Sequence, residues 1–127
     1  MRGAAGGKGI YFPEDVPQLP QGFFKEIGRY ALPELAFEVL RHYTRGDVPE
    51  AALESICQRV FSFPVSLVQV DGPVHALELY HGPSLSFKDI GAGLLAGLLR
   101  HYVEKYQRRF TVLVATSGDT GSAVAQS

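Results

Sequence analysis

Cysteine is nearly absent from this sequence. Cys57 is its one cysteine, so no disulfide bond can form within the chain. The residue falls inside an apolar helical pattern, which predicts a thiol in the core. A single free thiol is consistent with a reducing compartment.

The sequence also lacks an excess of charge of either sign and any long apolar run. Its 12 lysine and arginine residues nearly balance 13 aspartate and glutamate residues, for a formal net charge of -1. Nothing in this balance favours a polyanionic partner such as nucleic acid. No stretch is long and apolar enough to span a membrane, and the N-terminus lacks the apolar segment of a signal peptide. We therefore expect a cytoplasmic protein that binds neither nucleic acid nor a membrane.

The 127 residues, of which 46% are hydrophobic and 20% charged, are enough for one globular domain with one core. Apolar residues recur at helical spacing from Pro33 to Gly46 and again after Pro49, so a pair of helices is expected there. Two β-rich runs on either side of Asp71-Gly72-Pro73 predict a hairpin within residues 67–80.

A long helix is predicted from about Ser86 to Tyr106, and its first turn holds a lysine. Ser86 and Asp89 match the capping-box pattern S-x-x-D, which places Lys88 in that turn. The positive end of the helix dipole disfavours an ammonium group there and so favours the neutral amine. A neutral amine can attack a carbonyl carbon to form a Schiff base. The residues alone leave a second interpretation open, a solvent-exposed lysine that the helix tolerates at small cost.

Three glycines follow in the same helix, at Gly91, Gly93 and Gly97. Each weakens a helix by roughly 1 kcal/mol relative to alanine. Close approach of another element or of a ligand is expected to offset this loss, and tight packing against a sheet would suffice.

The C-terminal residues predict a strand, a turn and a helix. Phe110 to Ala115 have the pattern of a buried strand, and a helix is expected to begin near Thr120. The small residues from Thr116 to Thr120 leave backbone N–H groups free to face an anion at the carboxyl end of that strand. An ordinary connection fits the residues as well, and the carboxylate of Asp119 would repel an anion unless it is compensated.

Two stretches, ELYHGPSLSFKDIGAG and ATSGDTGSA, follow each other about one helix and one strand apart. Together they resemble the threonine synthase family, whose members are pyridoxal-phosphate enzymes of fold type II. GKGIYFPEDVP and the LPELAFEVL and GDVPEAAL segments are similar to the N-terminal region of that family. The resemblance extends from about Gly7 to Ser127. Because family members are several times longer, we expect the chain to be an N-terminal fragment.

The resemblance implies a role for each motif. Lys88 would hold the cofactor, pyridoxal phosphate, and would be the catalytic residue that moves protons. The substrate carboxylate would be bound by the turn residues Ser117, Gly118, Asp119 and Thr120, and no metal ion is implied. The reaction would convert O-phosphohomoserine and water to threonine and phosphate. The loop that grips the cofactor phosphate and the residue that faces the pyridine nitrogen lie further along the chain in the family, so the fragment alone is expected to be inactive.

The prediction is thus an α/β protein in two parts. Residues 1–80 would form a helical N-terminal region with a short β hairpin, and residues 81–127 the truncated start of a fold type II α/β/α domain that binds pyridoxal phosphate. Two alternatives stay open: a related phospholyase that acts on other amino acid phosphates, and a non-enzymatic domain whose turn binds an anion. The sequence does not indicate the oligomeric state.

Overall fold

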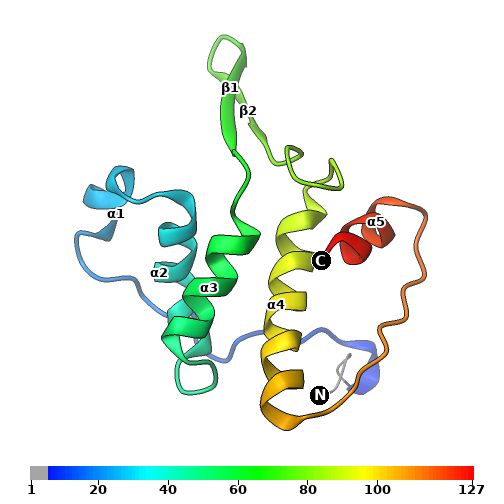
Figure 1. The fold of residues 1–127 in the computed structure, drawn as a ribbon. Coiled ribbons are helices and arrows are strands. Elements are labelled where there is room, and N and C mark those ends of the chain that lie inside the picture. The colour runs from blue at the N-terminus through cyan, green and yellow to red at the C-terminus, as the bar shows by residue number, and fades with distance from the viewer. Residues whose placement is uncertain (1–5) are drawn as a thin grey trace.

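The computed structural model describes residues 6–127 and is mainly helical, with one two-stranded antiparallel sheet (Figure 1). The short helical turns near the N-terminus precede a pair of longer helices, the hairpin, and two further helices. In chain order the elements are η1 (Gly6–Lys8), α1 (Phe23–Glu26), η2 (Ile27–Arg29), α2 (Leu32–Thr44), α3 (Glu50–Val60), β1 (Ser66–Asp71), β2 (Val74–Glu78), α4 (Lys88–Tyr106) and α5 (Asp119–Gln126).

The expected helical pair is confirmed as α2 and α3, which pack against each other. The carboxylate of Glu34 caps the start of α2 by accepting the N–H of Ala31 at 2.7 Å. The helix ends at Thr44, and Gly46 in the connection has a φ of 86°, a conformation that glycine adopts without strain.

The core lies between α2, α3 and α4. Its buried centre consists of Val48, Leu53 and Cys57, and the Cys57 side chain has no solvent-exposed surface. The predicted core thiol is therefore confirmed. Partly buried side chains pack around this centre: Ala36, Phe37, Leu40, Ala52, Phe61, Leu98 and Tyr102.

Two glycines of α4 allow this helix to approach α3 closely. A Cβ atom on Gly97 would lie 2.7 Å from Cγ2 of Ile56, and one on Gly93 would lie 3.3 Å from Cγ2 of Val60. Close packing thus accounts for both glycines, but the partner is a helix and not the sheet that we expected. A Cβ atom on Gly91 would meet nothing within 4 Å, so packing gives no reason for that glycine.

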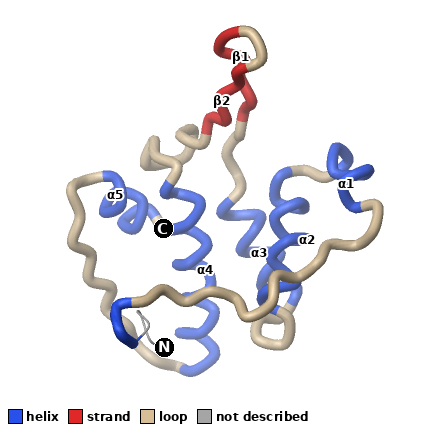
Figure 2. Tube along the Cα trace, turned by 180° about the vertical axis from the view of Figure 1, so that it is seen from behind, coloured by secondary structure: helices blue, strands red, loops and turns tan. Residues whose placement is uncertain are grey.

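The predicted hairpin is also confirmed. β1 pairs with β2 in antiparallel register, with Leu67 opposite Leu77 and a register irregularity after Gln69. Gly72 has a φ of 49° in the turn that joins them. Figures 1 and 2 show the hairpin projecting away from the helices, with the chain returning from β2 to the start of α4.

The predicted strand at residues 110–115 is wrong for the described structure. This segment is an irregular, solvent-exposed connection from α4 to α5 (Figure 2), and Leu113 is 91% exposed. A strand needs a neighbouring strand for its backbone hydrogen bonds, and the two strands within residues 6–127 pair only with each other. The helix expected near Thr120 is present as α5.

None of the helices that the structure describes combines the length and the apolar content needed to cross a bilayer.

Candidate functional site

Lys88 is the first residue of α4 and follows the loop 79–87. Its backbone N–H donates to Oγ of Ser86 at 3.2 Å. The carboxylate of Asp89 accepts the N–H of Ser84 at 2.9 Å instead of returning to Ser86. The predicted capping box therefore forms only in part, and the helix begins two residues later than expected.

The ammonium group of Lys88 lies against the start of α5. Its Nζ is 3.4 Å from Oδ2 of Asp119 and 5.3 Å from the ring centre of Phe87. The packing of α5 against α4 brings the lysine and the carboxylate together. The Lys88 side chain is 34% exposed and that of Asp119 is 73% exposed, so water screens this ion pair and it adds little stability.

Thr116 holds the turn before α5 in shape. Its Oγ1 accepts the N–H groups of Gly118 at 3.1 Å and of Gly121 at 3.2 Å. A Cβ atom on Gly121 would overlap Cγ2 of Thr116, so the close approach needs glycine. From the sequence, Thr116 stands at the edge of the turn without a role of its own. The signal that could have identified it is a threonine two residues before a glycine, a pattern typical of side-chain-stabilised turns.

The structure brings only one of the predicted turn side chains to the lysine. Residues 117–120 are all exposed. Asp119 contacts Lys88, whereas no hydrogen bond within the described residues joins Lys88 to Ser117 or Thr120. Lys88 and the turn thus meet through one pair of side chains, that of Lys88 and Asp119.

A shallow hollow borders this ion pair. Its lining is mostly apolar and comes from the end of the hairpin, the loop before α4 and the first residue of α5. The lining residues are Leu77, Leu79, Tyr80, Leu85, Ser86, Phe87 and Asp119.

A hydrogen-bonded cluster lies where β2 enters the loop before α4. Oε2 of Glu78 is 2.8 Å from Nε2 of His81. Hydrogen bonds from the Tyr80 hydroxyl and from His81 stabilise the carboxylate, and they lower the pKa of Glu78. The same bond to Glu78 raises the pKa of Tyr80. The cluster ties together the part of the chain that leads to Lys88.

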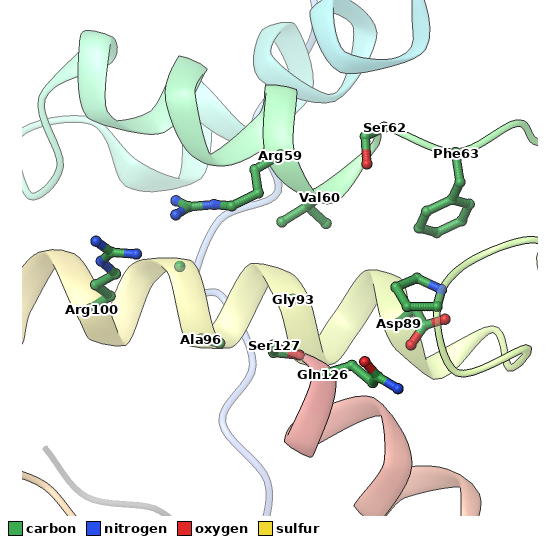
Figure 3. A pocket seen from close by; sticks show the side chains of 12 residues that line it. Arg59, Val60, Ser62, Phe63, Asp89, Gly93, Ala96, Arg100, Gln126 and Ser127 are labelled. Atoms are coloured by element: carbon green, nitrogen blue, oxygen red, sulfur yellow. The ribbon is translucent and has the colours of Figure 1, made fainter.

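Figure 3 shows a second cavity, of about 170 Å³, between α3, α4 and α5. Arg59 and Arg100 extend over one end of it, and Asp89 lies at the other end. None of the predicted site residues lines this cavity. It therefore lies apart from the amine of Lys88.

The arrangement at Lys88 offers one primary amine beside a carboxylate, that of Asp119, which lines a mostly apolar hollow. A primary amine is the group that reacts with an aldehyde, and its partial exposure leaves it accessible. These residues therefore fit a cofactor that carries an aldehyde, as pyridoxal phosphate does. In the part of the chain that is described, no three histidine, cysteine, aspartate or glutamate side chains gather into a metal site.

Comparison with known proteins shows similarity to threonine synthases over nearly the whole chain. Residues 1–61 match the family model described as the threonine synthase N terminus. The threonine synthase of Haemophilus influenzae is 38% identical over 124 residues, which is 98% of this chain and 28% of that protein. The human protein called threonine synthase-like 2 is 32% identical over 131 residues, covering 98% of this chain and 27% of that protein.

Two solved structures of threonine synthases superpose on nearly the whole of this chain. The threonine synthase of Escherichia coli superposes with a TM-score of 0.86 at 34% identity, and the match covers 98% of this chain and 28% of that one. A pyridoxal-phosphate-bound threonine synthase from Brucella melitensis superposes with a TM-score of 0.90 at 34% identity, over the same shares. The chain thus spans between a quarter and a third of the length of the relatives that it matches. Over almost its whole length the chain therefore matches the N-terminal part of members of the threonine synthase family.

Proposed function

We propose that the complete protein containing this sequence is a pyridoxal-phosphate-dependent lyase that converts O-phosphohomoserine and water to threonine and phosphate. One observation carries the proposal: the Lys88 amine lies 3.4 Å from Asp119, so the two family motifs meet in space. The 34–38% identity to threonine synthases supports it.

Each residue of the site has a part in this reaction. Pyridoxal phosphate, when bound, supplies an electron sink for chemistry at the substrate α carbon. Lys88 binds the cofactor through its amine and, once freed by the substrate, carries protons at the α and β carbons. Backbone N–H groups of Ser117, Asp119 and Thr120, at the positive end of α5, bind the substrate carboxylate. Gly118 shapes the turn instead, because its own N–H donates to Oγ1 of Thr116. The carboxylate of Asp119 draws the amine toward that turn, and the amine in turn offsets the repulsion between Asp119 and an anion.

The division of the chain at residue 80 is part of the proposal. Residues 1–80 form the N-terminal region, and residues 81–127 begin the cofactor-binding domain. The Lys88 helix, the turn before α5 and the contact between them all fall within the second part. We expect the 127 residues alone to bind the cofactor weakly or not at all and to have no turnover.

The test is a turnover assay on the complete gene product that contains this sequence. Release of phosphate and of threonine from O-phosphohomoserine should depend on added pyridoxal phosphate. Lys88→Ala should lower turnover by about 10³-fold or more. Lys88→Arg should be equally inactive, because a guanidinium stays protonated and cannot react with the aldehyde. Full activity in either variant would contradict the proposal.

A second candidate is a related phospholyase that removes phosphate from amino acid phosphates without forming threonine, since one relative is named threonine synthase-like and not threonine synthase. The same lysine and the same turn would serve it. The assay separates the two functions, because this enzyme would release phosphate while no threonine accumulates. A protein with neither product and no cofactor absorbance would instead be the non-enzymatic anion-binding domain.

A further inference from the structure

Leu85 has a backbone conformation that leucine rarely adopts. Its φ is 57°, in the left-handed region where Cβ crowds the following carbonyl oxygen. Among the described residues other than glycine, Gln107 alone shares a positive φ, and it ends α4, where a left-handed residue is common. No helix end accounts for Leu85.

Two hydrogen bonds keep the loop in this shape. The N–H of Leu85 donates to the carbonyl oxygen of Gly82 at 3.0 Å. The neighbouring N–H, of Ser84, donates to Oδ2 of Asp89 at 2.9 Å, and Asp89 is only 6% exposed. A buried carboxylate in the first turn of α4 therefore fixes the unfavourable conformation.

The conformation gains no packing for the leucine itself, because Leu85 is 77% exposed. Leu85 instead lines the hollow that Phe87 and Asp119 also line, and Asp119 is the residue that the Lys88 amine contacts. Unfavourable backbone conformations that persist without a packing benefit are concentrated at functional sites. The observations together favour a role for this side chain toward a ligand in the hollow.

We propose that Leu85 is a specificity-determining residue, whose side chain forms an apolar wall beside the Lys88 amine and contacts the carbon chain of a small phosphorylated amino acid. The inference rests on the proposed function and goes beyond it, because it names the residue that selects the length of that chain. Asp89 acts through Leu85 as a positioning residue.

The test compares Leu85→Gly and Leu85→Ala with the wild-type complete protein. Val70→Ala is a matched control, because Val70 is 65% exposed and lies in the hairpin, outside the lining of the hollow. The ratio of kcat/KM for O-phosphohomoserine to that for the shorter O-phosphoserine should fall about tenfold in both Leu85 variants, mainly through KM. The ratio should be unchanged in Val70→Ala.

Two readouts besides activity accompany the kinetics. Cofactor absorbance should be unchanged in both Leu85 variants. The Tm of Leu85→Gly should equal or exceed that of the wild type, because relief of the left-handed strain offsets the greater freedom of the unfolded chain.

The outcomes separate this inference from the proposed function. A wild-type ratio of kcat/KM values in an active Leu85→Gly variant would overturn the role of Leu85 and would leave the proposed function intact. A changed ratio accompanied by a lower Tm and lost cofactor absorbance would show a structural role and would also overturn it. A wild-type protein without lyase activity and without cofactor absorbance would overturn the proposed function, and this inference with it.

Discussion

The amine nitrogen of Lys88 lies 3.4 Å from Oδ2 of Asp119, although the two residues are 31 positions apart in the sequence. The contact depends on the packing of α5 against α4, since the segment between the two helices has no regular structure. Each residue is the first of its helix. The two helix starts thus place an amine, a carboxylate and the backbone N–H groups of a turn at one location.

Replacing Asp119 tests the value of this contact. Asp119→Asn in the complete protein should change the Tm by less than about 2 °C, because the ion pair is exposed and screened. Turnover should fall about ten- to a hundredfold, because the amine loses the partner that directs it to the turn. Glu104→Gln is the control, since it breaks the exposed pair with Arg100 far from the site. Unchanged turnover in Asp119→Asn would contradict the role given to Asp119.

The glycines of α4 should respond to alanine in opposite directions. Gly97→Ala should destabilise the protein by about 1–3 kcal/mol, because the new Cβ would lie 2.7 Å from Cγ2 of Ile56. Gly91→Ala should stabilise it by up to about 1 kcal/mol, because its Cβ meets no atom and alanine favours a helix. Denaturant unfolding measures both changes. Equal effects at the two positions would show that α4 does not pack on α3 as described.

Cys57 should react slowly with thiol reagents in the native protein. Burial, and secondarily the charge of Glu54, raise the pKa of its thiol and so disfavour the reactive thiolate. We expect its modification to be at least about a hundredfold slower in buffer than in denaturant, since reaction requires local or global opening. Rapid native modification would mean that the core between α2, α3 and α4 is open.

The Glu78 cluster should make stability depend on pH on the acid side. The pKa of Glu78 is lowered in the folded protein. The stability that Glu78 contributes is therefore fully present above its pKa in the unfolded chain, about 4.3, and is lost as the pH falls through its pKa in the folded protein. Glu78→Gln should therefore lower the Tm at pH 7, and the difference from wild type should shrink below about pH 4. Melting curves between pH 3 and pH 7 measure this. If the difference in Tm between wild type and Glu78→Gln stayed constant over this range, the ionised Glu78 carboxylate would not be its cause.

Local signals in the sequence predict much of this fold. Pro33 marks the start of a helix and Gly46 follows its end, because proline and glycine determine the backbone conformation at their own positions. The hairpin turn at Asp71-Gly72-Pro73 is predicted for the same reason. The apolar pattern around Cys57 predicts its burial, since one face of α3 meets the core. The motifs alone single out the lysine and the turn, but they do not predict that the Asp119 side chain contacts the lysine.

The features that the sequence does not predict depend on partners distant in the chain. Residues 110–115 are apolar enough for a strand, but strand formation needs a pairing partner, which the described residues do not supply. The glycines of α4 indicate a close neighbour without identifying it as α3. Asp89 satisfies the capping pattern, yet its carboxylate binds the N–H of Ser84, because the loop folds back over the first turn of α4.

Locating the cofactor on the chain tests the central claim most directly. The complete protein, loaded with pyridoxal phosphate, would be treated with borohydride, digested and mapped by mass spectrometry. The account predicts one pyridoxyl group, on the peptide that contains Phe87, Lys88 and Asp89, and none in Lys88→Ala. A pyridoxyl group on Lys8, Lys25 or Lys105 in place of Lys88 would contradict it.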